Sequence, residues 1–378
     1  MAELALFGLC AYPFKSLNEF FDKLELNEQE QSLIFKSDLP FEKIMETILE
    51  ESDISEIQDV FSDGEPNSNH ILLAKLIRNG LLPLIYTTNF DTLIEKAFNK
   101  EGLYRDEDYL VYSSNTDLHT IDWDDERPKL IKIHGCSSEK QDMAITLSQL
   151  ASNNYATLRT SLLSNLFCNN RIKSVLVLGY SCSDFDLTSI IETFNGERAN
   201  IFFVDHCHVE KKAEDIGLKV YKNPFKTYNG TRIYINTDKL LDQLWTKLLV
   251  QAKPHISIVP PNWKSKIDQW FLDAQESSGI GFRHHIAARL LYAISEFRLV
   301  IEHCQQAIVI AKKEGLWLTF ASEIGTMGLA YSALRELDAA IQCYKKALPI
   351  TRALGYTKNI CAQLQQYANA LHHSGENA

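Results

Sequence analysis

The 378-residue chain lacks the features that mark zinc proteins, membrane-spanning proteins and nucleic-acid-binding proteins. Its eight cysteines include no Cys-x-x-Cys pair, so the usual zinc-ligand spacings are missing and nothing indicates a disulfide framework. No run approaches roughly 18 apolar residues, the length that a membrane-spanning helix needs. Because 49 acidic residues outnumber 38 basic ones and give a net charge of −11, we expect no broad attraction to nucleic acid or to an anionic membrane.

Two further signals are absent. The opening MAELALFGLCAYPF is apolar but contains Glu3 and no basic segment, so we expect no secretory signal and a cytoplasmic location. None of the 16 glycines falls in a G-x-G-x-x-G or G-x-x-x-x-G-K-[ST] phosphate loop. With 45% apolar and 23% charged residues, the composition is that of an ordinary globular protein, long enough for two or three domains.

Several short apolar runs in the first two thirds of the chain are typical of buried parallel strands, because each is rich in β-branched or aromatic residues and ends at turn residues. They cover residues 81–89, 130–135, 174–181, 200–206 and 231–236, with helical patterns between them. Strands that alternate with helices predict an α/β fold, a doubly wound, mostly parallel Rossmann-like sheet over residues 1–250. The acidic, mostly helical residues 15–60 are expected to form a helical cap over one sheet face.

The last third of the chain has a different pattern. Residues 251–263 contain three prolines and are interpreted as a linker. Residues 264–378 are helical throughout and repeat with a period of 40, so that Gly328 corresponds to Ala288 and Tyr344 to Cys304. Small residues in one register and large ones in another are typical of stacked helix pairs, and the pattern resembles the tetratricopeptide repeat. A plain helical bundle is the alternative.

Polar residues follow the first two predicted strands, at the edge where an open α/β sheet binds ligands. Asn89 ends the run 81–89 and Asp91 lies two positions later, and the simpler interpretation is that one of them caps the next helix. His134 lies at the end of the second apolar run. It has the chemistry of a general base near neutral pH, although a lone histidine at a strand end is more often structural.

The later strand ends carry weaker signals. Gly179 permits close backbone approach, and Ser181 with Asp184 could meet a ribose or phosphate at a helix N-terminus, or simply cap that helix. Asp205 could hold ribose hydroxyls or be an ordinary loop carboxylate. The acidic run at 122–126 is interpreted as a solvated loop rather than a metal site.

Taken in order, these strand ends resemble the sirtuin-like family. T-T-N-F-D at 87–91 is similar to the family's T-Q-N-I-D, K-I-H-G at 132–135 to its catalytic H-G, and G-Y-S-C-S-D at 179–184 to its G-x-S turn. The segments 40–48 and 69–76 are similar to the cap and lead-in helices of bacterial members. The resemblance covers roughly residues 15–235 and rests on four ordered strand ends together, the fourth being that of Asp205.

The resemblance implies a hydrolase that uses NAD as its substrate and cleaves the bond between nicotinamide and ribose, with no metal. It assigns catalytic roles to His134, which would take a proton, to Asn89, which would orient the ribose and a water, and to Asp91 at the nicotinamide end. The residues that it places along the dinucleotide are Thr88, Gly179, Ser181, Asp184 and Asp205.

The chain departs from the family in two ways. It has no paired cysteines for the structural zinc of the deacylating members, so it resembles the zinc-free, repeat-linked bacterial branch of NAD-degrading antiphage defence effectors. It also has no Gly-Ala-Gly-x-Ser loop, and Leu6–Cys10 is a poor substitute for it. We therefore expect the first strand and the glycine loop to be missing. Either the chain begins downstream of the true start, or the protein has lost its activity.

Three functions follow from the sequence. The first is NAD hydrolysis in antiphage defence, with the helical repeats as the surface for a protein partner or phage trigger and for a possible homo-oligomer. The second is a catalytically silent sirtuin-like scaffold that binds a partner through its repeats. The third, a protein deacylase, is disfavoured by the absent zinc cysteines.

Overall fold

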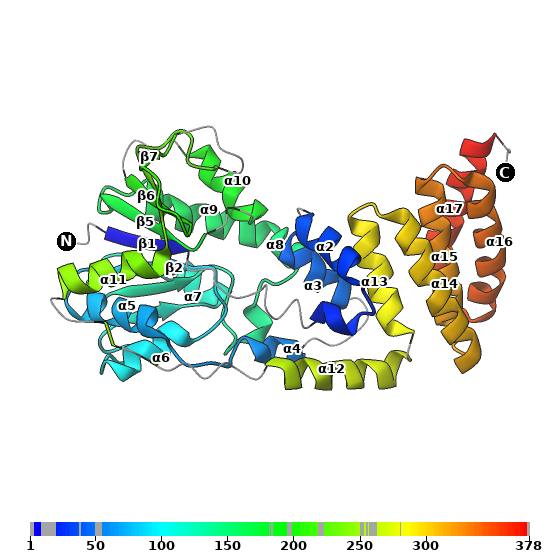
Figure 1. Cartoon of the computed structure of the whole chain (residues 1–378), viewed down its shortest axis with the longest axis horizontal. Coiled ribbons are helices and arrows are strands. Elements are labelled where there is room, and N and C mark those ends of the chain that lie inside the picture. The colour runs from blue at the N-terminus through cyan, green and yellow to red at the C-terminus, as the bar shows by residue number, and fades with distance from the viewer. Residues whose placement is uncertain are drawn as a thin grey trace. The chain divides into compact units, whose positions relative to one another are not determined.

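The computed structural model describes residues 4–8, 20–37, 39–49, 55–180, 182, 184–194, 199–217, 223–249, 253–254, 256, 263–279 and 281–375. The chain folds into two compact units, and each unit is built from two separate stretches of the sequence (Figure 1). The sheet unit contains Met1–Tyr12 and Ile57–Trp263, and the helical unit contains Pro13–Glu56 and Lys264–Ala378. The expected cap, residues 15–60, is thus grouped mainly with the C-terminal helices. No described helix is both long and apolar enough to cross a membrane.

The sheet unit is an α/β fold, as the sequence predicts, built on one eight-stranded sheet in the order β3-β4-β2-β1-β5-β6-β8-β7. All paired strands run parallel except β7, which is antiparallel to β8. The strands are β1 Leu4–Gly8, β2 Leu84–Thr87, β3 Leu110–Tyr112, β4 Lys129–Lys132, β5 Ser174–Leu178, β6 Asn200–His206, β7 Glu214–Asp215 and β8 Gly230–Ile235. Each of the five predicted strand runs overlaps one of them.

The expectation that the first strand is missing is wrong. Leu4–Gly8 forms β1, which lies in the middle of the sheet and pairs with β2 on one side and β5 on the other. This run has no β-branched residue and only one aromatic, so its local preference for a strand is weak. Parallel pairing on both edges and complete burial of Ala5 and Phe7 impose the strand conformation instead. Residues 9–19, which stand where the family has its glycine loop, lie outside the described residues.

Alternating side chains divide the core of this unit between the two sheet faces. Ala5 and Phe7 point to one face, which is covered by α7, α9 and α10, while Leu6 points to the other, which is covered by α5, α6 and α11. The helices of the unit are α5 Ser68–Arg78, α6 Leu93–Lys100, α7 Asn115–His119, α8 Leu147–Leu150, α9 Asn153–Phe167, α10 Phe185–Thr193 and α11 Thr237–Leu248, with a short 3-10 turn at Lys140–Asp142.

The helical unit begins with α2 Glu28–Lys36 and α3 Phe41–Leu49, which contact α13 Phe282–Ala293. Phe20, just before α2, stacks on the rings of Trp270 and Phe271 at 5.5 and 5.4 Å between centroids. Its other helices are α12 Trp263–Ser278, α14 Phe297–Glu314, α15 Trp317–Ala333, α16 Leu337–Ala353 and α17 Thr357–Ser374. The division between the two units, at Glu56 and Ile57, falls within the sequence of α4 Ser55–Val60.

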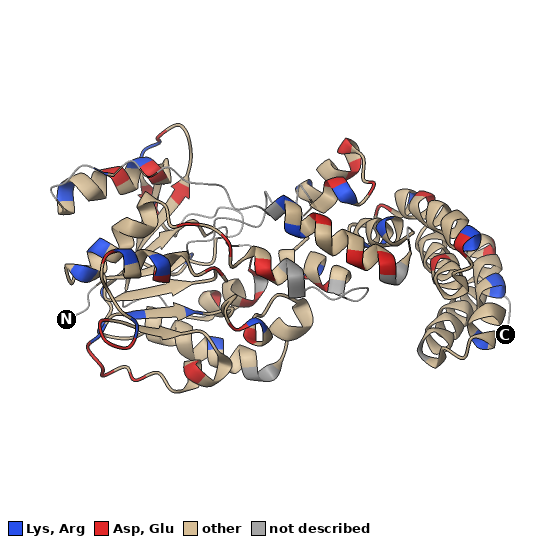
Figure 2. Ribbon diagram, turned by 90° about the horizontal axis from the view of Figure 1, so that it is seen from below, with Lys and Arg blue, Asp and Glu red and all other residues tan. Residues whose placement is uncertain are grey.

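The 40-residue period of the sequence is also the period of the helices. α14 and α16 begin 40 residues apart, as do α15 and α17. Ser295 and Arg335, also one period apart, both have positive φ (65° and 64°), and Gly315 and Gly355 do likewise at helix ends (73° and 74°). Consecutive helices from α13 to α17 pack on one another. Acidic and basic residues are interspersed along the described ribbon (Figure 2).

Candidate functional site

The carboxyl ends of the central strands are aligned. Gly8 at the end of β1 is paired with Thr87 of β2 and Leu178 of β5, Thr87 with Lys132 of β4, and Leu178 with Val204 of β6. The predicted site residues follow these positions by one or a few residues, so they gather along one sheet edge. Four strand intervals separate β4 from β6, a span of about 19 Å at the usual spacing. The strand order reverses at β1, which is where doubly wound sheets bind dinucleotides.

Gly8 lies at this reversal point and is held by close packing. Its φ is +109°, and an added Cβ would come within 2.5 Å of the Leu178 carbonyl oxygen and 3.0 Å of the Tyr180 Cβ. Only glycine therefore fits between the ends of β1 and β5. In the sequence, Leu6–Cys10 is a poor substitute for the family's glycine loop. In the structure, Gly8 occupies the last position of the first strand, where only glycine fits.

The residues after β2 form a tight polar turn. Thr88 is buried, and its Oγ1 has no hydrogen-bond partner within the described part of the chain. Asn89 is half-buried, and its backbone NH donates to Thr87 Oγ1 at 3.1 Å. The Asp91 carboxylate accepts from the Leu93 NH at 2.9 Å, which is the capping role predicted as the simpler alternative. That bond fixes the Asp91 side chain at the start of α6.

His134 lies just past the end of β4 and is buried, with 3% of the residue exposed. Backbone hydrogen bonds from Ile133 to the Thr87 carbonyl and from Ser137 to the Phe90 carbonyl hold the turn after β4 against the turn after β2. Gly135 allows this turn, because its φ is +92° and an added Cβ would lie 2.4 Å from the Asp142 carbonyl oxygen. The sheet thus brings the Asn89 and His134 turns side by side.

Two residues without an assigned role from the sequence complete the surroundings of His134. Its Nε2 lies 3.4 Å from Asp186 Oδ2 on α10, and the same oxygen is 3.1 Å from Arg159 Nη1 on α9. All three side chains are almost fully buried. Burial acts to raise the pKa of Asp186, but the hydrogen bond to His134 and the charges of His134 and Arg159 outweigh it and lower that pKa.

Lys132, the last residue of β4, connects the turn after β2 with the turn after β4. It is completely buried, pairs with Glu95 of α6 at 2.8 Å, and donates to the Asp91 carbonyl and to Cys136 Sγ. Burial acts to lower the pKa of Lys132, but the carboxylate of Glu95, together with Cys136 and Asp91, raises it, so the ammonium stays charged. Lys132 therefore fixes the start of α6 to the strand that carries His134.

The remaining predicted residues lie farther along the edge. Gly179 has a φ of +62°, and Asp184 is the N-cap residue of α10, without a side-chain cap bond. Burial raises the pKa of Asp184, and the neighbouring Asp186 charge adds to this. Asp205, at the end of β6, pairs with Arg232 at 2.8 Å. Ser181 lies outside the described residues.

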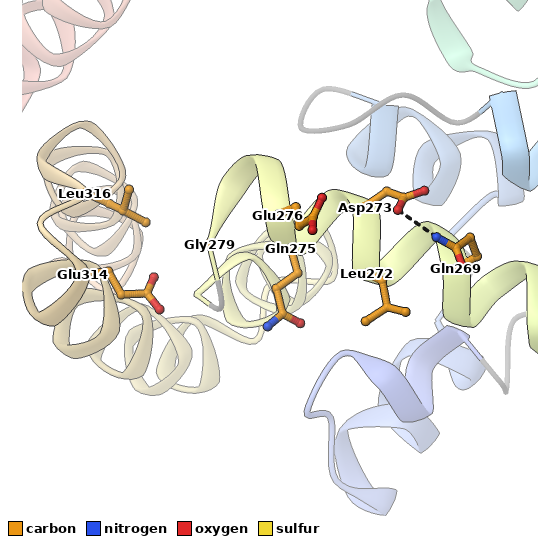
Figure 3. Close-up of a pocket in the computed structure, with 8 residues that line it drawn as sticks. All are labelled: Gln269, Leu272, Asp273, Gln275, Glu276, Gly279, Glu314 and Leu316. Carbon is orange, nitrogen blue, oxygen red and sulfur yellow. Dashed lines mark hydrogen bonds between the residues drawn. The ribbon is translucent and has the colours of Figure 1, made fainter.

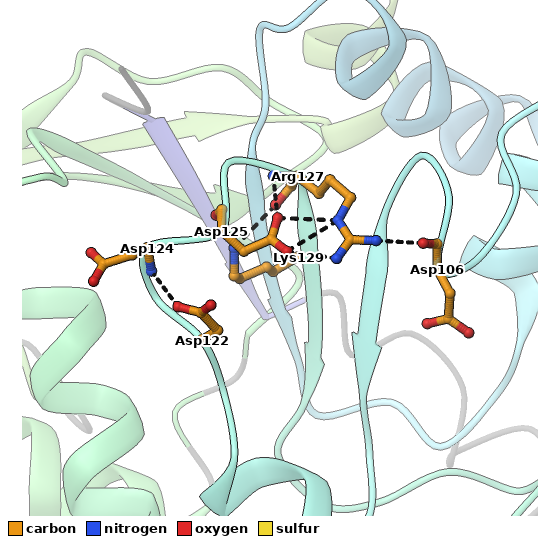
Figure 4. Close-up of polar contacts among 6 residues, drawn as sticks. All are labelled: Asp106, Asp122, Asp124, Asp125, Arg127 and Lys129. Carbon is orange, nitrogen blue, oxygen red and sulfur yellow. Dashed lines mark hydrogen bonds and ion pairs between the residues drawn. The ribbon is translucent and has the colours of Figure 1, made fainter.

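The acidic run at 122–126 lies at the opposite, amino-terminal edge of the sheet (Figure 4). The Asp122 carboxylate accepts from the Asp124 NH at 2.9 Å, and Asp125 pairs with Arg127 at 2.6 Å. Hydrogen bonds from Arg127 lower the pKa of Asp125 to about 2. These carboxylates stabilise a turn and an ion pair. Across the described residues no group of three or more His, Cys, Asp or Glu side chains is arranged to hold a metal ion.

Two cavities lie away from the candidate site. One, of about 770 Å³, opens beside the acidic run at the amino-terminal edge. The other, of about 520 Å³, lies in the helical unit between α12 and the α14–α15 turn, and its lining includes Asp273, Glu276 and Glu314 (Figure 3). Neither contains a residue predicted for catalysis.

Arg159 and Asp186 are the residues that sequence reasoning missed. Arg159 is the only charged residue in α9, and a single charge in an otherwise uncharged helix was a usable signal. Asp186 is the second carboxylate of S-D-F-D, two positions after Asp184. Only the packing of α9 and α10 against the strand ends shows that both reach His134.

Comparison with known proteins agrees with this arrangement. Residues 83–223, from β2 past β7, match the family described as "SIR2-like domain". The chain is also similar to the NAD(+) hydrolase ThsA of Acinetobacter baumannii (strain 532279), with 33% identity over 138 residues. That alignment covers 36% of this chain, and the chain spans about a quarter (26%) of the relative's length. The resemblance to the sirtuin-like family is therefore confirmed: residues 83–223 carry a SIR2-like domain.

Proposed function

We propose that this protein is an NAD hydrolase that cleaves the bond between nicotinamide and ribose. The observation that carries the proposal is that Asn89, Asp91 and His134 lie on the neighbouring turns after β2 and β4. Both turns are at the carboxyl edge of the sheet, on one side of the strand-order reversal at β1, in the region that matches a SIR2-like domain. The buried Thr88 hydroxyl supports it, because a buried hydroxyl without a partner costs roughly 1–3 kcal/mol and fits a ligand contact. The similarity to an NAD(+) hydrolase points to the same substrate.

In the proposed reaction a water oxygen forms a bond to the anomeric carbon of the ribose while the carbon–nitrogen bond breaks. The electron pair of the broken bond passes to the nicotinamide ring nitrogen, which neutralises its positive charge. His134 accepts the proton that the water loses and releases it to solvent. Asn89 orients the ribose and the water, and Asp91 meets the nicotinamide end. The dinucleotide lies past Thr88, Gly179, Ser181, Asp184 and Asp205.

The biological setting that we propose is antiphage defence, in which NAD is consumed once infection is sensed. The helical unit, with its 40-residue period, supplies the surface for a trigger, a protein partner or a second copy of the chain. This proposal rests on the resemblance to the repeat-linked bacterial branch.

One observation favours a second function. The sequence after Gly8, L-C-A-Y-P-F-K-S, has no further glycine for a pyrophosphate cradle. A SIR2-like module without that cradle would bind NAD weakly and act as a scaffold for a partner of the helical unit.

Release of nicotinamide from NAD by the purified full chain decides between these functions. We expect release by the wild type and none by His134→Ala or Asn89→Ala, each still folded by circular dichroism at the assay temperature. His119→Ala, which changes an exposed histidine of the same unit, is the matched control and should be fully active. Chromatography of the product separates ADP-ribose from a cyclised form. A folded wild type that releases no nicotinamide supports the scaffold.

A further inference from the structure

Among the described residues, only the Nε2 nitrogen of the His134 ring has a polar side-chain partner, and that partner is Asp186. The Nε2–Oδ2 distance is 3.4 Å, and 8% of the Asp186 side chain and 3% of that of His134 are exposed. A carboxylate accepts but does not donate, so in the neutral imidazole it selects the tautomer with hydrogen on Nε2. That tautomer leaves the lone pair on Nδ1, the nitrogen that a reacting group can use.

We propose that Asp186 is the positioning residue of His134: it fixes the ring orientation and the tautomer that make Nδ1 the proton acceptor. This inference rests on the proposed function, because it assigns the geometry of the same site. Arg159 has a supporting part, since it contacts the same Asp186 oxygen at 3.1 Å and sits over the Tyr155 ring at 4.4 Å. Asp186 Oδ1 has no hydrogen-bond partner among the described residues, whereas His134 Nε2 and Arg159 Nη1 both lie against Oδ2.

During the reaction Asp186 remains an anion. When Nδ1 takes the proton of the attacking water, the ring becomes a cation whose Nε2–H is still donated to Asp186, and the two opposite charges stabilise each other. Asp184, the N-cap residue of α10, also interacts with the charge of His134, and Arg159 from α9 acts on the same Asp186 carboxylate. The Phe90 ring, with its centroid 6.3 Å from that of His134, brings an apolar wall from the turn after β2.

A purely structural role is the alternative, because Asp186 also neutralises a buried arginine. Removing Asp186 alone takes a carboxylate away from the buried Arg159 cation, which is destabilising whatever Asp186 does for His134. The double variant Arg159→Met/Asp186→Ala removes both charges and avoids that cost. Its comparison with Arg159→Met alone isolates what Asp186 does for His134.

The first measurement is steady-state nicotinamide release by the full chain. We expect kcat of Arg159→Met/Asp186→Ala to be at least tenfold below that of Arg159→Met, with KM for NAD within about twofold, since a positioned base contributes roughly 10²–10⁴-fold. Equal kcat values for these two variants, both folded, would overturn the positioning role.

The second measurement does not depend on activity. The ¹⁵N-histidine NMR spectrum reports the tautomer, and the His134 signals are assigned as those lost in His134→Asn. In the wild type we expect the Nε2–H tautomer of His134. In the double variant we expect that preference to be lost. A wild-type ring with hydrogen on Nδ1 refutes the inference even if the double variant does not fold. If the wild type shows the expected tautomer but releases no nicotinamide, the proposed function fails and the positioning geometry stands.

Discussion

Asp184 and Asp186 lie two positions apart at the start of α10, yet their surroundings shift their pKa values in opposite directions. Burial raises the pKa of Asp184, so its ionised form costs stability. The partners His134 and Arg159 outweigh burial at Asp186 and lower its pKa, so its ionised form contributes stability. A raised carboxyl pKa gives stability at low pH that is lost as pH rises, and a lowered one gives stability that is lost as pH falls.

We therefore expect Asp184→Asn to raise the melting temperature at pH 7 and Asp186→Asn to lower it. Asn replaces Asp equally well at a helix N-cap, so the cap is not the variable. The loss of stability expected for Asp186→Asn is about 3–5 kcal/mol, the usual effect of breaking a buried ion pair. The Asp184→Asn difference should shrink as pH falls toward the ordinary Asp value of 3.8, where the unfolded carboxyl becomes protonated. The Asp186→Asn difference should persist down to that value and shrink only below it, as pH falls through the lowered pKa of the folded state. Thermal melts from about pH 2.5 to 7.5 measure this, and two variants with the same sign at pH 7 would contradict it.

Thr88 allows a second test at this scale. Thr88→Val removes a buried hydroxyl that has no partner in the described structure and keeps the shape of the side chain. We expect stability to rise by about 1 kcal/mol, and KM for NAD to increase severalfold because the hydroxyl is kept for the substrate. Urea denaturation and nicotinamide-release kinetics give the two values. An unchanged KM would remove Thr88 from the binding residues.

The sequence was enough to predict where Asn89 and His134 lie, because short apolar runs that end in polar residues locate strand ends without any tertiary information. It was not enough for Arg159. Helical periodicity indicates which side of α9 is buried but not which strand end that side meets. The ion pair with Asp186 depends on α9 and α10 packing side by side, a contact that no local pattern specifies.

At the scale of elements, the helical repeats show how one period accommodates a larger side chain. Gly328 of α15 lies against Tyr344 of α16, and an added Cβ would come within 2.9 Å of the Tyr344 ring. One period earlier the corresponding residues are Ala288 and Cys304, so a larger residue on the first helix accompanies a smaller one on the second.

Gly328→Ala should consequently destabilise the protein by about 1–3 kcal/mol through overpacking, although alanine favours a helix by about 1 kcal/mol. In a Tyr344→Cys background, which reproduces the preceding repeat, the same change should be neutral or stabilising. Urea midpoints of the four proteins complete a double-mutant cycle. Equal costs of Gly328→Ala in both backgrounds would show that the ring is not the cause.

β1 shows the limit of prediction for elements. The strands recognised in the sequence are rich in β-branched or aromatic residues, whereas Leu4–Gly8 has no β-branched residue and one aromatic residue. It is a strand because β2 and β5 pair with it on both sides. A central parallel strand gains its stability from neighbours that follow much later in the chain, so local propensity underestimates it.

At the scale of the whole molecule, residues from the beginning of the chain help to form the core of the helical unit. Phe20 stacks on Trp270 and Phe271, Lys23 pairs with Asp268 at 2.5 Å, and Glu30 with His303 at 3.3 Å. The sequence predicted this segment as a cap of the sheet, because helical pattern and acidity do not reveal which core a helix joins.

Phe20→Ala is expected to destabilise the helical unit by about 3–5 kcal/mol, the usual cost of removing a buried aromatic ring. Hydrogen exchange followed by mass spectrometry should then quicken in α12 and α13 and remain unchanged in β4 and β5. Leu272→Ala, at an exposed position of α12, is the control and should stay within about 0.5 kcal/mol of the wild type. Faster exchange in the strands alone would place Phe20 in the other core.

The interleaving of the two units constrains how this protein could have evolved. Since the chain forms β1, contributes residues 13–56 to the helical unit, and returns to the sheet unit at residue 57, neither unit is a contiguous gene segment. Exchanging the C-terminal repeats by end-to-end recombination would separate them from the helices near the beginning that complete their core. Substitutions in those two distant stretches should therefore covary among relatives, and new repeat arrays should be acquired only together with matching helices between β1 and α4.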